Sequence, residues 1–309
     1  MSRKLNRLVV AVFACALAAT HLRADEAEEL PQLTVAAFAP GGRFQLVTLD
    51  VSGNVVEQIV EDPTNLIFPQ WSPNGDRLAF VSVRTGHPQI HVLDIATQQR
   101  TELTTTSTIE THPCWSPDGK KLVFVSTRTG NYDVFVCDDD GSHPTNLTAS
   151  SSFDSDPCWS PDGKRIAFPS NRAAGGGLGP FHIWTMDADG GNAKQAVVRP
   201  LTGWIYPSWS PDGAQLLFSD RTADGSWQVF VASLDGRSQE QITEGTGSNG
   251  YASWSPDERY IAYLHFEKPL DPYPGPGRLM LFDTETATHT AIGPDDLKCN
   301  GSEPAWKPR

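Results

Sequence analysis

One short sequence motif recurs six times along the chain at a nearly constant interval. A tryptophan opens each copy, and the intervals between successive tryptophans are 44, 44, 50, 45 and 52 residues. The copies begin at Trp71 (WSPNG), Trp115, Trp159 and Trp209 (WSPDG), Trp254 (WSPDE) and Trp306 (a decayed WKPR). A repeat of this length in a strand-rich chain is typical of a β-propeller with one four-stranded blade per repeat. Propellers host many functions, so the repeat limits the function without defining it.

The repeat around Trp115 shows why each copy should form four strands. Its apolar segments are short and rich in Val and Phe, as in residues 121–126 (KLVFVS) and 134–137 (VFVC). Residues 117–119 (PDG) form the turn before the second strand, because proline presets φ and glycine accepts a positive φ. No stretch after the first 24 residues shows a sustained helical period, so we expect an all-β fold.

The two ends of the chain are expected to share one blade. Residues 45–70 align without a gap with residues 89–114, which gives the N-terminal part a third and a fourth strand. Residues 33–38 (LTVAAF) can supply the second strand, and residues 304–308 (PAWKP) remain at the C-terminus as the first. We therefore predict one six-bladed domain over residues 25–309, closed by pairing of N-terminal strands with the C-terminal strand, which leaves no open sheet edge.

Residues 1–24 have the pattern of a secretory signal peptide. Basic residues precede an apolar run over residues 8–19, and residues 22–24 (LRA) offer a small-residue cleavage site. The alternatives are an uncleaved anchor and, less favoured, a lipoprotein signal at Cys15. We expect an exported protein, periplasmic or secreted, with no membrane span in the mature chain.

The chain is strongly acidic, with a formal net charge of −13. Loss of the four basic residues in the signal segment would bring this charge to −17. An exported protein with this charge should repel nucleic acid and anionic lipid surfaces, and should favour a basic protein patch, a cation or a neutral ligand. Acidity that serves solubility alone is the alternative.

The cysteines after the signal segment predict neither a disulfide nor a zinc site. Cys114 and Cys158 stand directly before repeat tryptophans, at equivalent places in neighbouring blades whose inner strands should be too far apart for a bridge. Cys137 aligns with apolar residues in the other repeats, so we expect it to be a small buried hydrophobe. The cysteine spacings match no zinc motif.

The repeat resembles that of a known family. Its word P-x-W-S-P-D-G-K, strands such as KLVFVSTRTGN and RIAFPSNR, and turns such as VFVCDDDGS and IWTMDADGG followed by LT resemble the TolB-type six-bladed propeller. Related repeats occur in tricorn protease and in prolyl-oligopeptidase-like propellers. TolB itself carries an α/β domain before its propeller and binds a peptidoglycan-associated lipoprotein through the channel face. Little sequence stands between the expected cleavage site and the first strand, so the resemblance implies the propeller domain only, with recognition at its channel face.

The positions that vary within the repeat are the candidates for a binding site. Three residues before each tryptophan stand three aromatics, one histidine and two carboxylates: Phe68, His112, Asp156, Tyr206, Tyr251 and Glu303. In loops that enter the innermost strands, they should ring one mouth of the channel. Such a ring could hold a peptide, a sugar or a cation, and His112, Asp156 and Glu303 are candidate ligands for a divalent metal. The alternative is a set of solvated loop residues.

Catalytic signatures are weak. The sequence contains no G-x-S-x-G nucleophile elbow and no H-E-x-x-H motif, and SPDGKKLVF does not match a sialidase-type aspartate box. We predict no catalytic residue. Insertions over residues 172–180 and 267–277 are further candidate contact surfaces.

These observations together favour a monomeric, non-catalytic binding module of the cell envelope. Its expected partner is an envelope protein or a small ligand at the channel face, with no nucleic-acid partner and no cofactor other than a possible divalent cation. Two alternatives stay open: a metal-dependent enzyme that acts on a carbohydrate or peptide at the channel mouth, and a plain structural scaffold.

Overall fold

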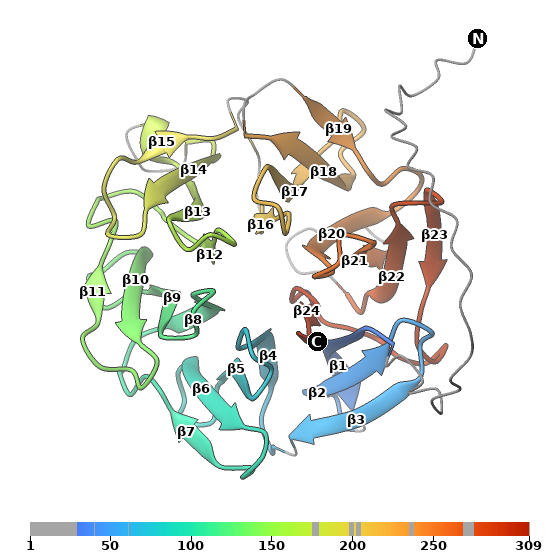
Figure 1. The fold of residues 1–309 in the computed structure, drawn as a ribbon, viewed down its shortest axis with the longest axis horizontal. Coiled ribbons are helices and arrows are strands. Elements are labelled where there is room, and N and C mark those ends of the chain that lie inside the picture. The colour runs from blue at the N-terminus through green and yellow to red at the C-terminus, as the bar shows by residue number, and fades with distance from the viewer. Residues whose placement is uncertain are drawn as a thin grey trace, which may run out of the picture.

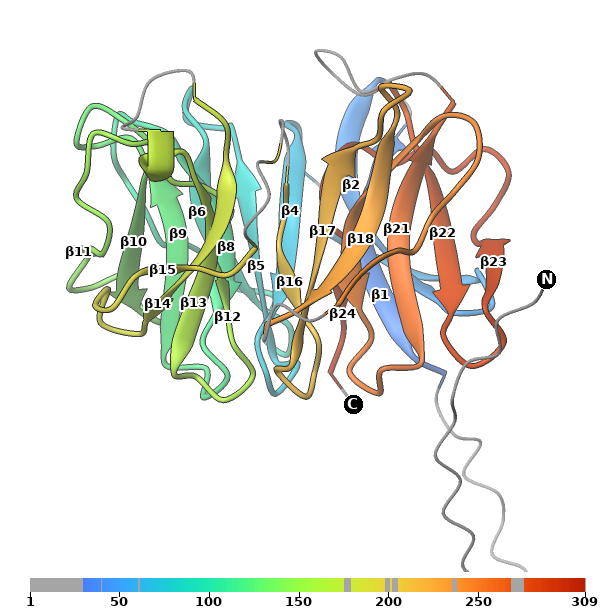
Figure 2. The ribbon, with the colours of Figure 1, turned by 90° about the horizontal axis from the view of Figure 1, so that it is seen from above.

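The fold is a closed ring of β-sheets. The computed structural model describes residues 30–39, 41–60, 62–174, 179–197, 201, 205–234, 238–267 and 275–308. Within these residues 24 strands form six four-stranded antiparallel sheets, and one 3-10 helix, η1 (Arg172–Ala174), follows a strand of the third repeat. The sheets stand around a common axis with one strand of each facing the centre (Figure 1), and the side view shows a disc (Figure 2). The predicted six-bladed fold is confirmed; the predicted signal peptide lies outside the described residues.

Five blades are each built from four strands that are consecutive in the sequence. From the innermost strand outward, the first blade contains β4 (Leu66–Trp71), β5 (Arg77–Ser82), β6 (Gln89–Asp94) and β7 (Arg100–Glu102). In the same order, the second contains β8 (Glu110–Trp115), β9 (Lys121–Ser126), β10 (Asp133–Asp138) and β11 (Thr145–Asn146). The third contains β12 (Cys158–Trp159), β13 (Arg165–Ser170), β14 (His182–Asp187) and β15 (Lys194–Gln195). The next two are β16 (Ser208–Trp209), β17 (Gln215–Arg221), β18 (Trp227–Ser233) and β19 (Gln239–Gln241); β20 (Ser248–Trp254), β21 (Tyr260–Phe266), β22 (Arg278–Asp283) and β23 (Thr288–Ala291).

The sixth blade joins the two ends of the chain, as the alignment predicted. Its strands, from the centre outward, are β24 (Ala305–Trp306), β1 (Gln32–Ala39), β2 (Arg43–Asp50) and β3 (Val55–Val60). In the antiparallel pair β1–β24, Leu33 faces Trp306 and Thr34 faces Ala305. The Thr34 hydroxyl also accepts a hydrogen bond from Trp71 Nε1 at 3.0 Å, which ties the closing blade to the next one.

The core lies between adjacent blades. A phenylalanine occupies the same place in the second strand of four blades and is at most 1% exposed in each: Phe80, Phe124, Phe168 and Phe218. The repeat tryptophans pack beside this layer, and several donate their indole N–H to a backbone carbonyl of the preceding blade. Trp115 binds the carbonyl of Gln70, and Trp209 that of Cys158, both at 3.2 Å. These contacts hold neighbouring blades together, as the repeat word predicted.

The cysteines of the described residues are free thiols. Cys137 is buried between the blades that contain β5 and β9, as expected from its place in the repeat. Over the described part of the chain, no helix is long and apolar enough to cross a membrane.

Candidate functional site

The six residues that precede the tryptophans by three positions converge on the channel axis. Five of them have a left-handed backbone, with φ of 52° at Phe68, 51° at His112, 43° at Asp156, 45° at Tyr206 and 57° at Tyr251. Bulky residues rarely adopt positive φ, and such strain persists only where the surroundings impose it.

Strand pairing shows what imposes this backbone conformation. The register between first and second strands shifts at this point in β4, β8 and β20, so the residue belongs to a β-bulge that re-aims its side chain. Phe68, His112 and Tyr251 therefore lie within strands, and not in loops before them as the sequence suggested.

The aromatic members of this ring pack against one another across the axis. Ring centroids are 3.9 Å apart for Phe68 and His112, 5.8 Å for His112 and Tyr206, and 4.4 Å for Tyr206 and Tyr251. Both tyrosines are 3% exposed, and burial raises the pKa of each phenol, which keeps them neutral. The ring is thus a packed layer inside the channel, where the sequence suggested an open ring at its mouth.

On one side of this layer the channel holds a pocket of about 300 Å³. We call it the channel pocket. Its inner end includes the ring residues Phe68, His112, Asp156 and Glu303, and its outer end includes the exposed prolines of the S-P-D-G turns, such as Pro117. Tryptophans and prolines make up much of the wall, so the pocket is an apolar cup with polar groups at its base.

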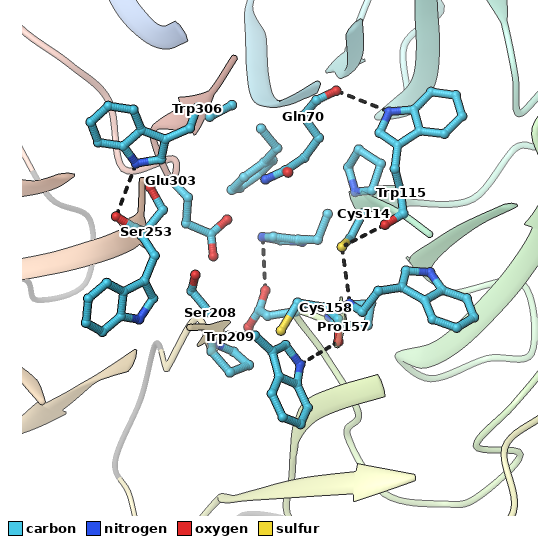
Figure 3. A pocket seen from close by; sticks show the side chains of 18 of the residues that line it. Gln70, Cys114, Trp115, Pro157, Cys158, Ser208, Trp209, Ser253, Glu303 and Trp306 are labelled. Atoms are coloured by element: carbon cyan, nitrogen blue, oxygen red, sulfur yellow. Dashed lines mark hydrogen bonds and ion pairs between the residues drawn. The ribbon is translucent and has the colours of Figure 1, made fainter. Parts of the chain in front are cut away.

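Glu303 is the most prominent polar group of the channel pocket. Its side chain points toward the middle of the cavity, as does that of Ser208 (Figure 3). Burial raises the pKa of Glu303 to about 8, and the nearby charge of Asp156 adds to the shift. Glu303 forms no ion pair or hydrogen bond with another side chain of the described residues. An uncompensated carboxyl in an apolar cavity is unusual, since such groups are normally paired.

His112 and Asp156 come together beside Glu303. His112 Nε2 lies 3.1 Å from Asp156 Oδ1, with side chains 15% and 7% exposed, respectively. Burial lowers the pKa of His112, so the imidazole is neutral near pH 7. Neither ring nitrogen has an aligned hydrogen-bond partner among the described residues, whereas Asp156 Oδ2 accepts a hydrogen bond from the Ser155 hydroxyl at 2.9 Å. The described residues that line the pocket include no lysine or arginine, so no cation of the chain offsets its carboxyl groups.

The structure also assigns to the channel pocket residues that the sequence did not single out. These stand directly before the tryptophans: Gln70, Cys114, Cys158, Ser208, Ser253 and Ala305. Residues two positions apart on a strand share a face. Because these residues follow the six channel-axis residues by two positions, the sequence spacing could have indicated that they line the same pocket. Cys114 Sγ accepts a hydrogen bond from the backbone N–H of Trp159 at 3.3 Å, and burial raises the pKa of its thiol to about 12, so the thiol is unreactive.

The three candidate metal ligands are not assembled as a metal site. His112 and Asp156 are in contact, but within the described residues no group of three or more His, Cys, Asp or Glu side chains could hold a metal ion. The inserted segments are only partly visible, because residues 175–178 and 268–274 lie outside the described residues.

Six blades around a central axis, with a pocket lined by their innermost segments, define the class: a β-propeller with a channel-facing pocket. A family model described as the TolB beta propeller domain matches residues 35–308. The chain belongs to this family.

Sequence relatives share short segments with this chain, and solved structures share its fold. The Tol-Pal system protein TolB of Albidiferax ferrireducens is 36% identical over 58 residues, which cover 19% of this chain and 14% of that protein. The matched segment thus spans about a seventh of the relative's length. TolB from Acinetobacter baumannii has a TM-score of 0.74 at 22% identity, over 90% of this chain and 66% of that one. A putative TolB from Agrobacterium tumefaciens has a TM-score of 0.68 at 20% identity, over 88% and 92%.

Proposed function

We propose that this protein is an exported, monomeric, non-catalytic binding module of the cell envelope, in the periplasm or secreted. It takes up part of a partner protein, or a small ligand, in the channel pocket. The observation that carries the proposal is Glu303, an unpaired carboxyl that points into an apolar cavity at the axis of the ring. Buried groups with shifted pKa values inside a concave pocket are characteristic of functional sites.

Two further observations support an envelope protein as the partner. Sequence relatives are named as proteins of the Tol-Pal system, and the first 24 residues have the pattern of an export signal. A divalent cation held by His112, Asp156 and Glu303 is a second proposal for the occupant, and it requires these side chains to move closer together.

The test is capture of a partner from an envelope extract by the mature protein and by two pocket variants. In Ser208→Phe, an aromatic ring fills the cavity; in the triple variant His112→Ala, Asp156→Ala, Glu303→Ala, the polar groups are removed. Ser107→Phe makes the same change at an exposed position and is the matched control. Circular dichroism and thermal melting confirm that each variant folds.

We expect a partner that the native protein and Ser107→Phe capture equally and that both pocket variants lose. Equal capture by all forms would place recognition outside the channel pocket and contradict the proposal.

A further inference from the structure

The charge of the channel pocket indicates the class of its ligand. Asp156 and Glu303 approach its base closely enough for the charge of one to raise the pKa of the other, and no basic side chain of the described lining residues offsets them. Elsewhere in the channel wall the chain supplies its own cations: Arg128 Nη2 lies 2.8 Å from Glu110, and Arg172 Nη2 lies 3.1 Å from Asp154. A ligand with a positive charge supplies what the pocket lacks, whereas an anion meets repulsion and desolvation together.

The walls of the pocket define the rest of the ligand. Its volume of about 300 Å³ lies at the lower end of small-molecule sites, which run from about 300 to 1,000 Å³. A volume of this size suits a single side chain. Tryptophan and proline walls suit an aliphatic stem, since lysine and arginine place their methylenes on apolar surface and direct the charged head to polar groups. Carboxylates bind such heads through short charge-assisted hydrogen bonds.

We propose that the channel pocket receives an organic cation on an aliphatic stem, an alkylammonium or guanidinium group like that of a lysine or arginine side chain, with Glu303 and Asp156 as its counter-ions. The inference rests on the proposed function and names the chemistry that the same site recognises. The group belongs either to a partner polypeptide or to a free polyamine.

A cation in the pocket favours the ionised form of Glu303, so any proton that this carboxyl holds passes to solvent as the ion pair forms.

The experiment is calorimetric titration of the mature protein with three probes at millimolar concentration. They are the blocked tripeptide acetyl-Gly-Lys-Gly-amide, the same peptide with an acetylated lysine, and putrescine. Glu303→Gln removes the charge with little change of shape, and Glu285→Gln makes the same change at an exposed site. Since Glu303 is neutral in the empty pocket at pH 7, Glu303→Gln is expected to fold.

We expect the lysine peptide or putrescine to bind, and at least a tenfold loss of affinity both on lysine acetylation and in Glu303→Gln. Glu285→Gln should bind as the native protein does. Tighter binding of the peptide identifies a polypeptide as the source, and tighter binding of putrescine identifies a free polyamine.

Three results overturn the inference: no binding of either cation, equal binding of the acetylated peptide, or unchanged binding by Glu303→Gln. Displacement of the cations by micromolar Ca²⁺ or Mn²⁺ also overturns it, in favour of a metal. Its failure is separable from that of the proposed function. If Ser208→Phe loses the partner but Glu303→Gln retains it, the proposed binding module stands and only the inference of a cationic ligand is contradicted.

Discussion

Two pairs of acids sit at two levels of the same channel wall and have opposite surroundings. At the first level Glu110 and Asp154 are 0% exposed, and each pairs with an arginine of its own blade. Two residues further along the chain, Asp156 lies beside a neutral imidazole and a serine hydroxyl, and no arginine or lysine of the described residues pairs with it. Glu303, in the closing segment of the ring, has no side-chain partner within the described residues.

The difference separates architecture from recognition. The arginines at the first level also donate to serines of the S-x-R sequence, as in the 2.9 Å bond from Arg128 Nε to Ser126, so each acid is part of a closed network. Such a network stabilises the blade, and its charges are already paired within the chain, so it does not need the charge of a ligand. At the second level no arginine or lysine of the described residues pairs with the acids, and burial of their carboxyl groups has a cost in stability that a bound cation can recover.

The largest expected effect comes from breaking the first level. Arg128→Met keeps an apolar stem over Phe135 but leaves Glu110 buried without its cation. We expect the free energy of unfolding to fall by about 3–5 kcal/mol, the usual cost of an uncompensated buried charge. Urea unfolding measures it. Arg278→Met, whose partner Asp295 is 95% exposed, is the control and should cost less than about 1 kcal/mol. Similar losses in both variants would contradict the comparison.

A smaller effect of the opposite sign is expected at the second level. The pKa of Glu303 is about 8 in the folded protein and 4.5 for the free side chain, so the folded state binds the extra proton between these values and stability falls as pH rises through them. Glu303→Gln lacks this loss. The free energy of unfolding of the variant should equal that of the native protein near pH 4.5. Above pH 8 it should be larger by on the order of 2 kcal/mol, after allowance for partial exposure of the side chain. Urea unfolding across this range tests it, and parallel pH profiles would show that Glu303 is not buried as described.

The smallest effect compares one serine from each level. Ser126 donates a hydrogen bond to Glu110 at 2.9 Å and accepts one from Arg128, whereas Ser208 points into the channel pocket. We expect Ser126→Ala to lower the free energy of unfolding by about 1–2 kcal/mol, and Ser208→Ala by less than about 0.5 kcal/mol. Thermal unfolding of the two variants side by side decides the matter, and a larger loss at Ser208 would contradict the assignment of the two levels.

The repeat made the fold predictable. A tryptophan at a fixed place in each repeat, with turn residues after it, sets the strand boundaries, and the predicted second strand over residues 121–126 coincides with β9 (Lys121–Ser126). The closing blade followed from counting strands at the two ends, because an open ring would leave an edge unpaired. These features are local or periodic, and so the sequence carries them directly.

The site was predictable only in part. The residues three positions before each tryptophan meet at the axis in the structure, but the sequence indicated neither their packing nor their pairing, and their role in binding stays a prediction. Positive φ at Phe68 or Tyr251 is imposed by a bulge in the pairing with the second strand, and no glycine in the sequence marks it. The contact of His112 with Asp156 joins two blades, and the contact of Tyr206 with Tyr251 joins two others. Such relations depend on the closed ring, and no single repeat encodes them.

The pairing of β24 with β1 links the binding of a ligand to the closure of the ring. Glu303 and Trp306 line the channel pocket, and they belong to the same short segment that seals the ring. A molecule that has formed its other five sheets but not this pairing has neither a closed disc nor a complete pocket. Ligand binding and ring closure are therefore linked equilibria. A ligand that binds only the complete pocket stabilises the pairing of β24 with β1 and so favours the closed ring.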